Sequence, residues 1–249
     1  SSASGFSALT GALLLAFNLD GKFHDKEEFS RQVRLCGSGS AIRSCMDGYV
    51  EFSTLKEAYI ARGGFTSEVL NEDFKARLHK ESKAIELADH KHWDLADVVA
   101  IVNSEKKLVS SSQGHLAADS SPYFETRVDN METRNNKIRQ AILDKDLESL
   151  GAEIEADSNS MHAIMMTSDP AIFYWMPGSL NIMLNIIRWR REEGLMAYYT
   201  LDAGANVHII CEAKDIDKVD KKLKSLPYVQ WTIKNKVCQG AREIKNHLF

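Results

Sequence analysis

Two short segments near the end of the chain most restrict how it can fold. Residues 197–201 and 207–211 read as strands, and the glycine-containing loop 202–206 joins them. Long helical patterns precede these strands, at 123–143, 147–166 and 177–193, and Gly194 ends the last of them. This order favours helices packed on one face of an antiparallel sheet, which makes the second half an α+β domain.

The rest of the chain gives weaker patterns. Residues 6–17 are apolar on nearly all sides, which predicts a buried helix, and residues 25–35 predict an amphipathic one. Residues 53–92 are polar and predict an excursion with one or two surface helices. Strands are predicted at 49–52, 95–102, 229–233 and 242–244.

The helix that begins at Pro177 has an expected apolar face and an expected solvent-exposed end. Leu180, Met183, Leu184 and Ile187 form the apolar stripe. The arginines between 188 and 191 are most simply explained as a solvated helix end.

Composition excludes several classes of protein. The 249 residues are 44% hydrophobic and 27% charged, with a formal net charge of −4, so we expect no nucleic-acid partner. No apolar run approaches the roughly 20 residues that span a bilayer, so we expect no membrane partner. The four cysteines form no CxxC pair, which is typical of reduced thiols in a cytoplasmic protein.

A glycine- and serine-rich segment is the first candidate binding site. Ser38 and Ser40 lead into a helix start that carries Arg43. Backbone N–H groups, hydroxyls and a guanidinium together can bind a phosphate or a carboxylate. The alternative is an ordinary turn capped by serine.

Other polar residues are weaker candidates when taken alone. Asp202 ends a strand and could orient or deprotonate a hydroxyl, although such an aspartate often only forms an Asx-turn. Ser1 and Ser2 precede a helix and could bind phosphate or simply cap it. Lys106 follows a buried strand and could face a phosphate, but a solvated lysine is the default. We predict that His162 is a hydrogen-bonded core residue and not a base.

Several motifs follow one another along the chain: SSASGF (1–6), GSGSAIRSCMDGYVEF (37–52), VNSEKKLVSSSQG (102–114), DSNSMHA (157–163), PAIFYW (170–175) and YYTLDAGANVHI (198–209). Taken together in this order, they resemble the diphosphomevalonate decarboxylase family of the GHMP kinase superfamily. The resemblance implies a two-domain GHMP-kinase fold. Residues 1–105 would be the remainder of an N-terminal ATP- and substrate-binding domain, similar to ribosomal protein S5 domain 2 but lacking its first strands. Residues 106–249 would form a ferredoxin-like C-terminal domain.

The resemblance also implies roles for the candidate residues. Asp202 would interact with the C3 hydroxyl of the substrate, and Arg43 would bind its C1 carboxylate. Ser38 and Ser40 would line the pocket near the substrate's phosphates. Ser1 and Ser2 would contact the phosphates of ATP, with Ser2 a candidate Mg²⁺ contact, and ATP and Mg²⁺ are the implied cofactors.

The implied activity is ATP-dependent decarboxylation of mevalonate 5-diphosphate to isopentenyl diphosphate, with ADP, phosphate and CO₂ as the other products. The alternatives are a phosphomevalonate decarboxylase, a mevalonate 3-kinase or a catalytically silent homologue, and a homodimer is expected from the family. The family has further residues before the first motif, including a lysine that works beside the aspartate. A polypeptide that truly began at Ser1 would therefore be expected to be inactive and poorly folded.

Overall fold

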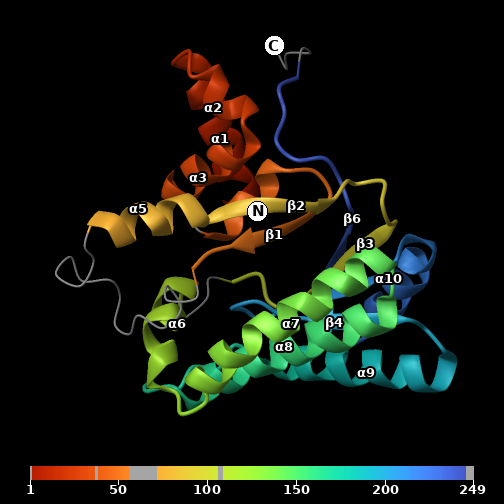
Figure 1. Ribbon diagram of the computed structural model, residues 1–249. Coiled ribbons are helices and arrows are strands. Elements are labelled where there is room, and N and C mark those ends of the chain that lie inside the picture. Colours follow the sequence, from red (N-terminus) through yellow and green to blue (C-terminus); the bar gives the residue numbers. More distant parts are fainter. Residues whose placement is uncertain (1, 37–38, 56–71, 106–108, 245–249) are drawn as a thin grey trace. The chain divides into compact units, whose positions relative to one another are not determined.

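The computed structural model describes residues 2–36, 39–55, 72–105 and 109–244, and contacts divide them into two units (Figure 1). Unit 1 contains the described residues up to His92 together with 237–244, and unit 2 extends from Trp93 to Lys236. This division does not coincide with the boundary expected at 105/106. The reason is that the strand at 95–101 pairs with strands of unit 2.

Unit 1 is a group of helices packed beside a two-stranded antiparallel sheet. Its core contains Leu14, Phe29, Val33, Ile42 and Cys45. The strands pair with Ser53 opposite Lys83. In chain order the elements are α1 (Ser2–Ala16), α2 (Asp20–His24), α3 (Lys26–Cys36), the 3₁₀ helix η1 (Gly39–Cys45), β1 (Tyr49–Ser53), α5 (Glu72–Glu81) and β2 (Lys83–Ala88).

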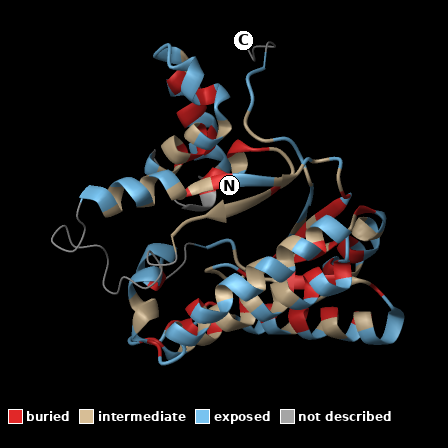
Figure 2. Cartoon of the chain, in the orientation of Figure 1, coloured by how far each residue is buried: buried red, intermediate tan, exposed pale blue. Residues whose placement is uncertain are grey.

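Helix α1 forms as predicted, but the prediction that it is buried on nearly all sides is wrong. Ser7, Thr10 and Leu14 are buried, whereas Leu9 and Leu13 are 58% and 46% exposed. Figure 2 colours the described residues by their burial. The buried stripe therefore carries two hydroxyls, and the sequence alone does not show which side of an all-apolar helix faces the core.

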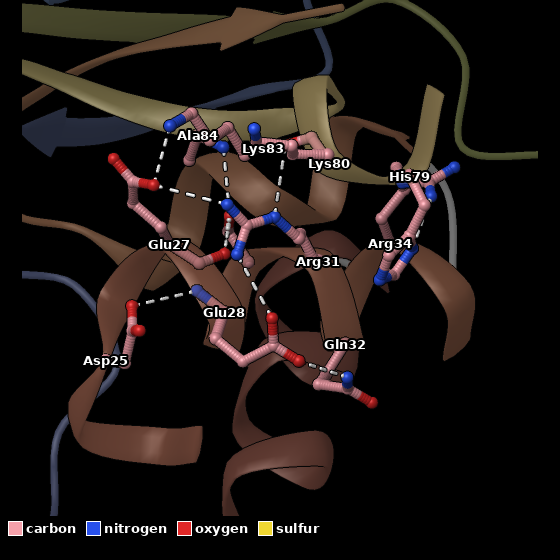
Figure 3. A network of polar contacts seen from close by, with 11 residues as sticks. Asp25, Glu27, Glu28, Arg31, Gln32, Arg34, His79, Lys80, Lys83 and Ala84 are labelled. Carbon is pink, nitrogen blue, oxygen red and sulfur yellow. Dashed lines mark hydrogen bonds and ion pairs between the residues drawn. The ribbon is translucent and has the colours of Figure 1, made fainter. Parts of the chain in front are cut away.

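Charged side chains connect α3 to the α5–β2 segment, as Figure 3 shows. Arg31 contacts Glu27 and Glu28 at 3.2 and 3.1 Å, and its Nε donates to the Lys80 carbonyl. Lys83 reaches Glu27 from β2 at 2.6 Å. These contacts attach the α5–β2 segment to α3, although most side chains of that segment are polar.

Unit 2 is built on a four-stranded antiparallel sheet with the order β4-β5-β3-β6. Strands and helices alternate as β-α-β-β-α-β, which is the ferredoxin-like arrangement that was predicted. The elements are β3 (Leu95–Ile101), α6 (Ser111–Ala117), η2 (Ala118–Ser120), α7 (Phe124–Asp144), α8 (Leu147–Thr167), α9 (Pro177–Glu193), β4 (Ala197–Thr200), β5 (Val207–Glu212), η3 (Ala213–Asp215), α10 (Ile216–Lys224) and β6 (Trp231–Lys236).

Helices α9 and α10 cover one face of this sheet. Ile182 and Ile186 of α9 and Leu223 of α10 pack against Val98 and Ile209 of the strands. Two predictions about this region are wrong. Leu180 and Leu184 are exposed because Ile182 and Ile186 face the sheet instead, and residues 242–244 form no strand.

Helix α8 packs along the outer edge of β4, where an edge strand has unpaired backbone groups. The Glu155 carboxylate accepts a hydrogen bond from the Tyr199 N–H at 3.2 Å. The Ser158 hydroxyl accepts one from the Leu201 N–H at 3.0 Å. Side chains of α8 therefore take the place of a neighbouring strand. The bond between Ser158 and Leu201 lies one residue before Asp202.

Candidate functional site

The loop that follows β4 presents Asp202 to solvent. The Asp202 side chain is exposed and has no hydrogen-bond partner among residues 2–36, 39–55, 72–105 and 109–244. The Gly204 N–H donates to the Asp202 backbone carbonyl at 2.8 Å, so a backbone bond forms the turn. The Asx-turn alternative is therefore not observed, and the carboxylate keeps its acceptor positions for another group.

Side chains from two other elements fix the far end of this loop. The Asn206 side-chain oxygen accepts hydrogen bonds from the N–H groups of Val102 and Asn103, at 2.9 and 3.1 Å. The buried Ser179 hydroxyl donates to the Ala205 carbonyl at 2.6 Å. The loop is thus tied to the end of β3 and to the first turn of α9.

Two buried side chains of α8 hold the near end of the loop. The Ser158 hydroxyl bonds the Leu201 N–H and lies 3.4 Å from the Leu201 carbonyl. His162 is 1% exposed and lies beside the Leu201 backbone. The prediction that His162 is a core residue is therefore confirmed.

Burial lowers the pKa of His162 to about 4, against the smaller raising effects of the Leu201 backbone and the nearby Asp202 charge. The folded protein therefore holds a neutral ring at pH values where the unfolded chain takes up a proton. We expect the free energy of unfolding to fall as the pH is lowered from 6.5 towards 4. Urea unfolding across this range should show a weaker pH dependence for His162→Asn, and equal slopes would contradict the expectation.

A second histidine lies on β5 near the same loop. His208 Nδ1 is 2.9 Å from an Asp97 carboxylate oxygen across the sheet. This bond raises the pKa of His208, with smaller raising effects from the Asp97 and Asp202 charges. Asp202 therefore lies near two imidazoles, one with a pKa lowered by burial and one with a pKa raised by a neighbouring aspartate.

Arg43 belongs to unit 1. The 3₁₀ helix η1 buries Ala41, Ile42 and Cys45 and leaves Arg43 exposed. Burial raises the pKa of the Cys45 thiol to about 11, so this cysteine is a packing residue and not a nucleophile. The core contacts of η1 thus fix the backbone from which the guanidinium extends.

The remaining predicted site residues are placed only in part. Ser1, Ser38 and Lys106 lie outside the described residues, and Ser2 and Ser40 are described by their backbone alone, in the first turns of α1 and η1. Asp202 belongs to unit 2 and Arg43 to unit 1. Their convergence on one ligand stays a prediction.

Sequence reasoning missed the residues that hold the Asp202 loop. Ser158 lies within the DSNSMHA motif, which contributed to the resemblance without an assigned role. Asn206 likewise lies within the YYTLDAGANVHI motif without an assigned role, and Ser179 gave no signal. Each of the two binds the backbone of a distant segment.

Within the described ranges, no three histidine, cysteine, aspartate or glutamate side chains gather as a metal site. Among these residues, no helix is both long and apolar enough to span a membrane.

Comparison with known proteins identifies the family of both parts. A sequence model described as "Mevalonate 5-diphosphate decarboxylase C-terminal domain" matches residues 97–247. Another, described as "Diphosphomevalonate decarboxylase-like N-terminal domain", matches residues 1–59. The diphosphomevalonate decarboxylase of Candida albicans is 33% identical over 224 residues, which are 88% of this chain and 55% of that protein. The chain therefore spans about half the length of this curated relative.

Solved structures agree with this result. The mevalonate diphosphate decarboxylase of Staphylococcus aureus superposes with a TM-score of 0.77 at 28% identity, covering 96% of this chain and 66% of that one. A structure described as "MDDEF in complex with MVAPP, AMPPCP and Magnesium" gives 0.76 at 28% identity, with the same coverage. The predicted GHMP-kinase fold is confirmed by these neighbours. The chain belongs to the mevalonate 5-diphosphate decarboxylase family.

Proposed function

We propose that the complete protein catalyses ATP-dependent decarboxylation of mevalonate 5-diphosphate to isopentenyl diphosphate. One observation carries this proposal in addition to family membership: Asp202 is an exposed carboxylate without a described hydrogen-bond partner, on a loop tied to α8, α9 and β3. A fixed carboxylate of this kind can accept the proton of a substrate hydroxyl.

A tertiary alcohol is a poor leaving group, so the reaction first phosphorylates the C3 hydroxyl. This step requires a carboxylate that is directed at the hydroxyl. ATP converts the C3 hydroxyl to a phosphate ester and leaves as ADP. When the C3–O bond breaks, inorganic phosphate departs with the bonding electron pair. Electrons of the C2–carboxylate bond then form the new double bond, and CO₂ is released. Asp202 would orient the hydroxyl and accept its hydrogen bond in the first of these steps.

ATP and Mg²⁺ are part of the proposal. The N-terminus of α1 begins at Ser2, and the first N–H groups of a 15-residue helix favour a bound phosphate. Mg²⁺ would bind together with the nucleotide, with Ser2 the proposed contact. When bound, the ion would neutralise charge on the transferred phosphoryl group.

Arg43 would bind the carboxylate that is lost. Too tight an ion pair would stabilise the ground state and slow the release of CO₂, so the guanidinium should act mainly by positioning. We expect Arg43→Gln to lower kcat more than it raises KM for mevalonate 5-diphosphate, as measured by steady-state kinetics. A variant whose only defect is a raised KM would contradict this role.

The complete protein should be incubated with ATP, Mg²⁺ and each mevalonate phosphate while ADP and CO₂ are measured together. Equal release of both products from mevalonate 5-diphosphate is the expected result. Preference for mevalonate 5-phosphate would indicate a phosphomevalonate decarboxylase, and ADP alone would indicate a 3-kinase. Neither product would indicate a silent homologue. A cytoplasmic location and a homodimer stay predictions.

A further inference from the structure

Helix α8 presents a row of side chains to the edge of β4, and this row ends at the peptide before Asp202. Gly151, Glu155, Ser158 and His162 are spaced by three or four residues, so they share one face of the helix. Glu155 binds the N–H of Tyr199 and Ser158 that of Leu201. The last two members of the row therefore both act on Leu201.

The contacts of these two residues cover both polar groups of Leu201. The Leu201 N–H donates to the Ser158 hydroxyl. The Ser158 hydroxyl also donates to the Leu201 carbonyl, at 3.4 Å, and the buried His162 ring lies beside the same backbone. Two side chains from one helix thus fix the orientation of a single residue.

Both side chains lie deep in the core, where polar groups are costly. Ser158 is 3% exposed and His162 is 1% exposed. One ring nitrogen of His162, Nε2, is buried and has no partner among the described residues. An apolar side chain would avoid this cost at either position, so the contacts to Leu201 are what these residues add.

We infer that Ser158 and His162 are positioning residues that set the direction of the Asp202 carboxylate through the Leu201 peptide. The inference rests on the proposed function, since it concerns the orientation of the Asp202 carboxylate towards the substrate hydroxyl. Proton transfer and phosphoryl transfer depend steeply on geometry, and a misplacement of about 1 Å costs up to about 100-fold in rate.

The test compares four variants of the complete protein. Ser158→Ala and His162→Leu remove the two contacts to Leu201. His162→Asn keeps an N–H group that can reach the carbonyl. Tyr199→Phe is the matched control, because it removes the 3.1 Å bond to Asn159 between the same helix and the same strand without touching Leu201.

Ser158→Ala and His162→Leu should each lower kcat about tenfold, with KM for mevalonate 5-diphosphate within about twofold. His162→Asn should recover most of kcat, and Tyr199→Phe should keep it within about twofold. Hydrogen exchange at the Leu201 amide should accelerate in Ser158→Ala but not in Tyr199→Phe, a readout that needs no turnover.

The outcomes separate the two proposals. A wild-type protein that forms neither ADP nor CO₂ overturns the proposed function and with it this role. An active wild type whose Leu201-contact variants keep its kcat, or lose it no more than Tyr199→Phe, overturns the positioning inference alone. If Ser158→Ala does not fold, the comparison of His162→Leu with His162→Asn decides.

Discussion

Replacing Asp202 with alanine should lower kcat of the complete protein by on the order of 10³-fold, which corresponds to about 4 kcal/mol of transition-state stabilisation. The carboxylate is the group assigned to the reacting hydroxyl, and alanine has no polar side chain to replace it. Thermal stability should not fall, because the side chain is exposed and has no hydrogen bond to lose among the described residues. Coupled measurement of ADP release and a thermal melt would check both statements.

Asp202→Asn is the stricter form of this test, because it keeps the shape of the side chain and removes its charge. A loss similar to that of Asp202→Ala is expected if the carboxylate accepts the proton. Asp217→Ala is a suitable control in the same unit. Its side chain is 84% exposed and, among the described residues, forms a surface ion pair with Lys234, which contributes little stability. Near-normal turnover by Asp202→Ala would refute the assignment.

The elements of unit 2 could be predicted because their signals are local. Pro177 begins α9 and Gly194 ends it with a backbone φ of 64°, a conformation that favours glycine. Strands β4 and β5 were recognised on either side of a glycine-containing loop. A ferredoxin-like arrangement of this unit was expected from the family resemblance.

Features that depend on tertiary contacts could not be predicted in the same way. Strand β2 was missed because a two-stranded sheet leaves most of its side chains partly exposed, and its sequence, KAIELA, shows no clear alternation. Helix α6 was not predicted. Ser110 and Gln113 form its capping box, but the helix has only 7 residues, too few for a clear periodic pattern.

Only those site residues were predicted whose own side chains would bind the substrate or take part in the reaction. Asp202 was a candidate because a carboxylate at the end of a strand can orient or deprotonate a hydroxyl. Ser158 was not, because its importance depends on a backbone group 43 residues away in the sequence. Positioning residues of this kind become visible only when the partner backbone is known.

Arg190→Met should lower the free energy of unfolding by about 3 kcal/mol or more, the second large effect that we expect. The solvated helix end predicted for the arginines is wrong at this position. Arg190 binds both carboxylate oxygens of Glu155, at 3.0 and 2.9 Å, and donates to the Ala197 carbonyl at 2.6 Å. Its guanidinium also lies 4.2 Å from the ring centre of Tyr198. Methionine would leave Glu155, whose side chain is only 13% exposed, without its cation.

Arg188→Met is the matched control, because Arg188 lies on the same helix, is exposed and, within the described part of the chain, donates to Asn185 of its own helix. Its variant should stay within about 0.5 kcal/mol of the wild type in urea unfolding. The double variant Arg190→Met/Glu155→Met should be less destabilised than the sum of its single variants, because removing both partners leaves no buried charge alone. Additive losses, or equal losses at the two arginines, would contradict the pairing. Glu155 also binds the Tyr199 N–H. The double variant lacks this carboxylate and should therefore also loosen the contact between α8 and β4 that leads to Asp202.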